Sequence, residues 1–373
     1  MNTLKFGNGE WYGKEGTILA YNDENSNYKP LPFDFSRDSK ATVVNKDGLI
    51  ETVASGEPRI DYKDDSKGAL LLEPSRTNLY TYSNDVSFWT KSNVVTTSDY
   101  AISPDGTQNA FRAAFSSSIG LLYVTATGTT GTNNTLSVWA KSNNGSSNKF
   151  RFFANGNTTL SNDFIATDEW QRFEFTFNCT SVTAGLTGAS DSATNDIIFY
   201  AFQHEVGSYP TSYIPTQGSI VTRNQDVCNN GGVGVPIFSN TYAVWFMDLE
   251  RIGVSDLDIG DSLTLRDDSN VRQITLWFDS PSKQIRFRDG KNSLTQIGGV
   301  MSTSEGTRKK IALKIDGETL KLFAEGSQVG ANYTKVNSFD ITQMTMQGIG
   351  YKIRNIKFYN TTLTDQELIA LTS

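Results

Sequence analysis

The chain of 373 residues contains a single histidine, His204, and this limits the chemistry that it can perform. A serine–histidine–acid triad would have to use His204, but no Gly-x-Ser-x-Gly turn accompanies it. Catalytic zinc sites usually take two or three histidines among their ligands, so a histidine-based zinc site is excluded. We therefore expect His204 to have a structural or surface role.

Paired carboxylates are a second route to catalysis, because glycoside hydrolysis needs only two of them across a cleft. Asp248 and Glu250 share one face of a predicted strand, but the third acid typical of glucanases is missing. Gln203 and Glu205 also share a strand face. We expect a solvated strand end for the first pair and a buried or half-buried hydrogen-bond network for the second. The sequence predicts no enzyme.

A calcium site is a further alternative, because calcium needs only oxygen ligands. Residues 256–261 include Asp256, Asp258 and Asp261, but the pattern lacks the acids expected at loop positions five and twelve. The sequence therefore predicts no cofactor and no metal, and it leaves a structural calcium ion open. Cys179 and Cys228 are too few to form a disulfide scaffold, so we expect no disulfide.

Sugar binding relies on aromatic faces and polar side chains displayed on a rigid sheet. In the stretch 136–141, Leu136, Val138 and Ala140 share one strand face, which puts Trp139 on the other face with Ser137 and Lys141. The candidate glycan-binding residues are Trp139, Trp89 and Tyr123. The alternative is that these rings pack between sheet and loops, and we expect Trp170 and Trp245 to do so.

The composition excludes some partners. The formal net charge is −7 and the pI about 5.0, which disfavours nucleic-acid binding because that depends on Lys and Arg neutralising phosphates. No run of 18 apolar residues occurs, so we expect no membrane span. Residues 1–7 lack the features of a secretory signal, so we expect synthesis and retention in a cytoplasm.

Short strands separated by turn residues dominate the chain. Phe173, Phe175 and Phe177 share one strand face, and the run 197–202 is apolar on both faces, as in a central strand. Asp47-Gly48 and Asp316-Gly317 predict tight hairpins, the first a type I′ turn. The fold class is therefore all-β, with an extended N-terminal arm and two antiparallel β-sandwich (jelly-roll) domains.

The expected domains are four consecutive segments of the chain. Residues 1–70 form an extended segment, an arm over 1–30 and a stretch over 31–70 that wraps the sandwich after it. Residues 71–225 form the first sandwich, 226–235 a linker, and 236–373 the second sandwich. At the C-terminus, Thr364 and Glu367 predict a capping box, and Leu363 and Leu368 the accompanying hydrophobic staple.

Several phrases occur in an order that resembles one family. They are LLEPSRTNL at 71–79, Trp89, SPDGT at 103–107, LSVWAK at 136–141, EWQRF at 169–173 and EVGSYPTSYIPT at 205–216. Over roughly residues 30–225 the chain resembles a β-sandwich module of bacteriophage virion proteins, chiefly tail and head fibres, akin to carbohydrate-binding modules. A strand before a capped helix at 353–369 resembles the end of a concanavalin A-like (laminin G-type) jelly roll.

These resemblances imply a function for the chain. The first hypothesis is a non-enzymatic virion protein, a tail or head fibre or a capsid decoration, assembled in the host cytoplasm. It would attach to other virion proteins through its N-terminal segment and bind host-surface glycans. We expect a homo-oligomer, a trimer, in which avidity multiplies weak sites. The second hypothesis is a purely structural capsid or tail component. The third is a glycan-degrading enzyme, which the missing acid array and the missing secretory signal disfavour.

Overall fold

The computed structural model is almost entirely β, which confirms the predicted fold class. It describes residues 33–126, 130–181, 183–191, 193–233, 239–253, 263–278, 284–302, 306–348, 350–359 and 361–373 in full. For residues 3–6, 11–12, 20–22, 28–30, 260–262 and 279 it describes only the strand backbone. Within these ranges the helical structure is limited to a 3-10 turn at Val86–Phe88 and helix α1 at Asp365–Thr372.

The chain divides into two compact units, and each is built from more than one segment. Unit 1 comprises Met1–Lys40, Val53–Pro74 and Asn224–Ser373. Unit 2 comprises Ala41–Thr52 and Ser75–Arg223. Each unit has its own core.

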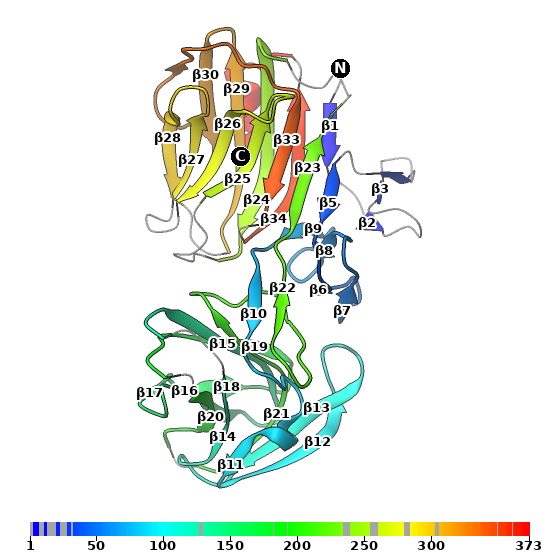
Figure 1. The fold of residues 1–373 in the computed structure, drawn as a ribbon, viewed down its shortest axis with the longest axis vertical. Helices are drawn as coiled ribbons and strands as arrows, with labels where there is room; N and C mark the ends of the chain where they lie inside the picture. Colours follow the sequence, from blue (N-terminus) through cyan, green and yellow to red (C-terminus); the bar gives the residue numbers. More distant parts are fainter. Residues whose placement is uncertain are drawn as a thin grey trace. The chain divides into compact units, whose positions relative to one another are not determined.

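Unit 2 is a sandwich of two antiparallel sheets (Figure 1). The order of its five-stranded sheet is β12 (Val94–Ile102), β13 (Gln108–Phe115), β21 (Asn195–Val206), β15 (Asn133–Ser142) and β19 (Gln171–Asn178). The other sheet has the order β11 (Thr90–Ser92), β14 (Leu121–Thr125), β20 (Thr183–Gly188), β16 (Asn148–Ala154) and β17 (Thr159–Leu160), and β18 (Phe164–Ala166) also pairs with β16. The central strand β21 is buried on both faces, as its apolar run predicts.

A hairpin covers part of the outer face of the five-stranded sheet. It consists of β6 (Ala41–Val44) and β7 (Ile50–Val53), which confirms the hairpin predicted at Asp47-Gly48. Val44 and Ile50 of this hairpin join an apolar cluster with Tyr200 of β21. The five-stranded sheet therefore packs on both faces, against the other sheet and against this hairpin.

The two phrases of the virion-module resemblance meet in unit 2. The Nδ2 atom of Asn78 donates hydrogen bonds to the carbonyl oxygens of Phe202 and Ile214, over 3.1 and 2.9 Å. Its Oδ1 atom accepts from the backbone N–H groups of Tyr80 and His204. Buried backbone groups need such partners, so one amide side chain joins the start of the sandwich to its closing segment.

Unit 1 is a second antiparallel sandwich (Figure 1). Its nine-stranded sheet has the order β31 (Ser327–Gln328), β30 (Thr319–Ala324), β29 (Arg308–Asp316), β24 (Tyr242–Arg251), β34 (Tyr351–Tyr359), β9 (Ala69–Leu72) and β8 (Arg59–Asp61), with β1 (Thr3–Phe6) paired to β34 and β32 (Tyr333–Thr334) to β30. Its seven-stranded sheet has the order β28 (Thr295–Ser302), β27 (Gln284–Asp289), β26 (Arg272–Asp279), β25 (Gly260–Arg266), β33 (Gln343–Gln347), β23 (Val227–Gly231) and β5 (Asp34–Ser36). A separate small sheet contains β2 (Trp11–Tyr12), β3 (Ala20–Asn22) and β4 (Tyr28–Pro30).

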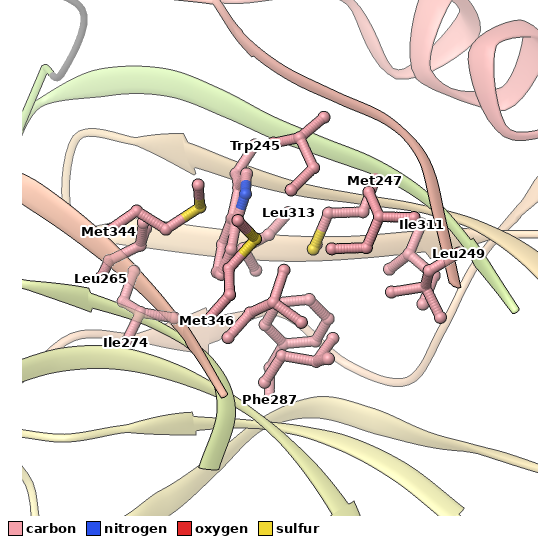
Figure 2. Packing of buried hydrophobic residues seen from close by; sticks show 14 of the residues in the cluster. Trp245, Met247, Leu249, Leu265, Ile274, Phe287, Ile311, Leu313, Met344 and Met346 are labelled. Atoms are coloured by element: carbon pink, nitrogen blue, oxygen red, sulfur yellow. The ribbon is translucent and has the colours of Figure 1, made fainter. Parts of the chain in front are cut away.

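The core of unit 1 contains Trp245 of β24, which confirms the core position expected for this ring (Figure 2). Helix α1 begins with the predicted capping box, in which Thr364 and Glu367 each accept a hydrogen bond from the other's backbone. Leu363 and Leu368 pack in one cluster on the outer face of the nine-stranded sheet, as the hydrophobic staple predicts.

The structure corrects the expected segment boundaries. The described part of residues 31–70 does not wrap the following sandwich alone, because β5, β8 and β9 are strands of the unit 1 sheets. All four side chains of β9 are buried, so this strand belongs to a sheet covered on both faces. The linker predicted over 226–235 is also wrong in its described part, since Val227–Gly231 forms β23 between β33 and β5.

A buried ionic network attaches these early strands to the rest of unit 1. Asp226 accepts hydrogen bonds from Nη1 of Arg37 (3.0 Å), from Nη2 of Arg59 and from the backbone N–H of Glu73 (2.8 Å). Arg59 also donates to the Glu73 carboxylate, over 2.8 Å. Burial disfavours the charged guanidinium, but Asp226 and Glu73 outweigh this effect and raise the pKa of Arg59.

Candidate functional site

Strand β15 presents Trp139 on the outer face of the five-stranded sheet. Leu136, Val138 and Ala140 are fully buried in the core between the two sheets. Because side chains alternate along a strand, Trp139 and Lys141 lie on the opposite face. The face assignment made from the sequence is therefore confirmed.

Strand β19 adds to the same face. Phe173, Phe175 and Phe177 pack towards the core, which leaves Arg172 and Glu174 on the outer side. In the antiparallel register, Arg172 lies opposite Trp139. Trp170, just before β19, completes the group, which we call the Trp139 face: Trp139, Lys141, Trp170, Arg172 and Glu174.

Both indoles of the Trp139 face are half-buried and supported from below. They pack against the outer apolar cluster that contains Tyr200 and Tyr213. The Nζ atom of Lys141 lies 5.2 Å from the centre of the Trp170 ring, a cation–π contact. Each ring is thus held in place while part of its surface remains open to solvent.

Hydrogen bonds fix the polar side chains around these rings. Nη2 of Arg172 donates to Oγ of Ser137 over 2.9 Å and to the carbonyl oxygen of Thr211 over 2.8 Å. The Tyr200 hydroxyl donates to Oδ2 of Asp105 over 2.9 Å. Burial, together with Tyr213 and Asp105, raises the pKa of Tyr200, so this hydroxyl stays protonated and continues to donate.

The arrangement suits the binding of a polar molecule that has apolar faces. Pyranose rings stack their C–H faces on aromatic rings, and their hydroxyls need donors and acceptors nearby. Trp139 on β15 and Trp170 just before β19 offer two such rings. Lys141 and Arg172 supply donors, and Glu174 supplies an acceptor. A rigid site of this kind loses little entropy on binding.

The other two predicted glycan-binding residues lie elsewhere. Trp89 is 4% exposed, and its ring packs on Tyr80 and Phe202 in the core of unit 2. Its Nε1 atom donates to the carbonyl oxygen of Tyr82 over 2.9 Å. The prediction for Trp89 is therefore wrong, because a sugar cannot reach a ring that the core covers.

Tyr123 is half-buried on β14, in the other sheet of unit 2. Its ring meets the edge of Phe153, at a centroid distance of 5.7 Å. Gly185 lies opposite both residues in the sheet, and a Cβ atom there would come within 2.7 Å of Tyr123 Cβ. Tyr123 thus stays a separate prediction, because the structure does not bring it together with Trp139.

The Gln203 and Glu205 pair forms the predicted buried network. Nε2 of Gln203 donates to Oε2 of Glu205 over 2.6 Å, and the Thr211 backbone donates to the same oxygen over 3.0 Å. Oε1 of Gln203 accepts from the backbone N–H of Ile214 over 2.6 Å. These groups hold the closing segment of the sandwich, and because they are fully buried no ligand in solution can reach them.

His204 is also structural, as expected. It is fully buried, and its ring lies against Tyr80 and Phe177. Nε2 donates to Oδ1 of Asn134 over 2.9 Å. Burial lowers the pKa of His204 to about 4, so the ring is neutral near pH 7.

The Asp248 and Glu250 pair is not a solvated strand end, which corrects that expectation. Asp248 is buried and ion-paired with Arg308, with an Nη2–Oδ2 distance of 2.5 Å. Glu250 pairs with Arg354, with an Nη2–Oε2 distance of 2.6 Å. Cations on adjacent strands thus neutralise both acids.

Metal-binding clusters of side chains are absent from the described part of the structure. Across its described ranges, no cluster of three or more His, Cys, Asp or Glu side chains has metal-binding geometry. The calcium candidates Asp256 and Asp258 lie outside the described residues, and of Asp261 only the backbone is described. Cys179 and Cys228 are buried free thiols. Of the helices in the described part of the chain, none is long and apolar enough to span a bilayer.

One residue of the Trp139 face corrects an expectation from the sequence. Trp170 does not lie in the core, because its ring is half-buried and joins Trp139 on the outer face. The alternation of Trp170, Arg172 and Glu174 with the phenylalanines of β19 was the signal that could have found it.

Comparisons with known proteins show no family for this chain. No family model and no curated protein matches the chain. Among solved structures, it is similar to galectin LEC-6 of Caenorhabditis elegans, with 11% identity, a TM-score of 0.26 and coverage of 34% of this chain and 86% of the galectin. It is also similar to domain 4 of AbnA, an extracellular arabinanase from Geobacillus stearothermophilus, with 15% identity, a TM-score of 0.33 and coverage of 44% and 83%.

A third similarity is to the Trypanosoma rangeli sialidase in complex with the inhibitor DANA, with 16% identity and a TM-score of 0.30. It covers 36% of this chain but only 23% of the sialidase. The chain therefore spans less than a quarter of that enzyme's length.

Proposed function

We propose that this protein is a non-enzymatic component of a phage virion, a tail or head fibre or a capsid decoration, that binds host-surface glycans through the Trp139 face. The observation that carries the glycan-binding part is the pair of half-buried indoles of Trp139 and Trp170, with Lys141 and Arg172 beside them. The resemblance of the ordered sequence phrases to phage virion modules supports the virion part.

The state of the acidic residues supports a binding role over catalysis. A general acid or nucleophile must reach the substrate. Asp248 and Glu250 are neutralised by Arg308 and Arg354. Glu205 is fully buried in its network.

Weak sugar sites gain strength when several copies act together, so the proposal includes a homo-oligomer, with three copies as the predicted number. In this proposal the N-terminal residues 1–30 attach the protein to other virion proteins. Removal of residues 1–30 should therefore abolish incorporation into particles without loss of glycan binding.

A purely structural role is the second candidate, and one observation favours it. Strand β12 is an edge of the five-stranded sheet and exposes Val95 (68%), Tyr100 (41%) and Ile102 (62%). Edge strands offer unpaired backbone groups to other chains. Such an edge suits contact between proteins without any glycan.

A glycan array with purified protein tests the proposed function. Trp139→Ala and Trp170→Ala should each reduce binding at least tenfold, since stacking on each ring is lost. Phe88→Ala is the matched control, because Phe88 is an exposed aromatic residue of unit 2 outside the Trp139 face, and it should bind normally. No binding to any host glycan by the wild type would favour the structural role. Shortened chains after incubation with host capsule polysaccharide would show an enzyme.

A further inference from the structure

The seven-stranded sheet of unit 1 has an outward face of unusual composition. Figure 2 shows Leu265, Ile274, Phe287 and Met344 pointing into the core of unit 1, from strands β25, β26, β27 and β33. Because side chains alternate along each strand, the residues next to these four point away from the core.

The outward residues form two adjoining rows across the sheet. In one row, Thr275 lies opposite Arg288 on one side and Thr264 on the other, and Thr264 lies opposite Thr345. In the next row, Trp277 of β26 lies opposite Arg286 of β27. Three threonine side chains thus form a small polar floor beside an indole and two arginines.

The arginines of this face are held in defined positions. The guanidinium carbon of Arg288 lies 4.4 Å from the centre of the Trp277 ring, a close cation–π contact. Nε of Arg266, on the far side of the threonine floor, donates to Oγ1 of Thr345 over 3.2 Å. Nη2 of Arg286 donates to the Gln284 side chain over 2.7 Å.

The described side chains of this face carry a charge opposite to that of the whole chain. Among the outward positions of β25, β26, β27 and β33 whose side chains the structure describes, none is acidic: Thr264, Arg266, Gln273, Thr275, Trp277, Gln284, Arg286, Arg288, Gln343, Thr345 and Gln347. The chain as a whole carries a net charge of −7. Arg266, Arg286, Arg288 and Trp277 are half-buried, so each also reaches solvent.

We propose that this Arg–Trp face, defined by Arg266, Trp277, Arg286 and Arg288, binds an acidic polysaccharide. Guanidinium groups pair with carboxylate or sulfate groups through two parallel hydrogen bonds. Trp277 offers an apolar surface to the uncharged part of the sugar ring. This second site lies in unit 1 and is independent of the Trp139 face, and it prefers negatively charged glycans.

The observations favour an acidic glycan over a nucleic acid. Nucleic acid carries a phosphate at every nucleotide, and binding it requires neutralisation of a dense row of charges. The Arg–Trp face has three arginines around one indole, on a protein whose net charge repels such a polyanion. A polysaccharide with one acidic group per disaccharide matches this sparser pattern.

Calorimetric titration of the full chain tests the proposal with polygalacturonate, alginate, polysialic acid, heparin and neutral dextran as probes. The wild type should bind at least one acidic polymer, and bind it at least tenfold more tightly than dextran. Arg288→Gln and Trp277→Ala should each weaken that binding at least tenfold. Trp139→Ala should leave it unchanged, so failure here is distinguishable from failure of the proposed function.

The experiment needs a control for folding, because Trp277 is part of strand β26 and its replacement can destabilise the sheet. Arg288→Lys keeps the charge but loses the planar fork, so it should bind at an intermediate level while its melting temperature matches the wild type. The proposal is overturned if no acidic polymer binds. It is equally overturned if Arg288→Gln, with a normal melting temperature, binds as the wild type does, or if single-stranded DNA binds as tightly as the acidic polymers.

Discussion

Nε2 of His204 lies 2.9 Å from Oδ1 of Asn134 in a part of unit 2 that solvent does not reach. The Asn134 oxygen can only accept, so Nε2 carries the proton. Nδ1 has no hydrogen-bond partner among the described residues. A second proton would therefore place an unpaired charge in the core.

This geometry predicts a pH dependence of stability. The pKa of His204 is about 4 in the folded protein and 6.5 in the unfolded chain, so the unfolded chain binds the proton first as the pH falls. The contribution of the neutral His204 ring to the free energy of unfolding is complete above pH 6.5. The free energy of unfolding should therefore decrease by about 3 kcal/mol between pH 6.5 and pH 4. Urea unfolding at several pH values measures this change.

Two controls isolate His204 as the cause. Half-exposed carboxylates such as Asp365, whose pKa the Lys321 hydrogen bond lowers below 3.8, titrate outside this window. In His204→Gln the decrease between pH 6.5 and pH 4 should disappear. The chain has one histidine, so the Hε1 proton of its ring gives a single NMR signal, and a titration midpoint near pH 6.5 in the folded protein would contradict the prediction.

Asp226→Asn should destabilise unit 1 strongly. The substitution leaves the buried guanidinium groups of Arg37 and Arg59 without their shared carboxylate. Removal of one partner of a buried ion pair costs about 3–5 kcal/mol of unfolding free energy. Asp365→Asn is the matched control at a half-exposed pair and should cost less than about 1 kcal/mol. Similar losses for both variants, measured by chemical denaturation, would contradict the argument.

Trp89 and Trp139 should respond differently to truncation. Trp89→Ala removes a ring from the core and should cost about 3–5 kcal/mol of stability. Trp139→Ala removes a half-buried ring and should cost about 1–2 kcal/mol. Melting curves measure the loss of stability in Trp89→Ala. The Trp139→Ala variant should remain folded, and its glycan binding should decrease. A stable Trp89→Ala variant that loses only binding would restore the sequence-based prediction for Trp89.

Helix α1 depends on its cap. Thr364→Ala removes the hydroxyl that accepts from the Glu367 backbone, at 3.2 Å, and should cost about 1 kcal/mol. Thr362→Ala, at an exposed position before the helix, should be neutral. Faster amide exchange in residues 365–368 of the Thr364 variant alone is the expected readout.

The local features of this fold were predictable from the sequence because short-range rules determine them. Alternation identified the strands and the outward position of Trp139, and the capping box identified α1. The turn at Asp47-Gly48 shows the limit of such rules. Gly48 has a φ of 78°, but Asp47 is not among the residues with positive φ, so the hairpin forms without the type I′ turn.

Long-range pairing was not predictable. Nothing in the local pattern of Leu70–Leu72 indicates that β9 pairs with β34, more than 250 residues later. From the sequence alone, Arg37 and Arg59 would be expected at the surface, because their partner Asp226 lies far away along the chain. The exposure of each tryptophan likewise depends on what covers it, and only the tertiary structure shows that core residues cover Trp89.

The order of segments along the chain has a consequence for synthesis. Unit 1 needs strands from before Pro74 and from after Asn224, whereas most of unit 2 lies in between as an insertion. During translation the inserted sandwich can fold first, while β9 stays without its partner β34 until the ribosome has synthesised the end of the chain. Premature termination near residue 300 should thus leave a folded insertion attached to an incomplete and aggregation-prone host domain.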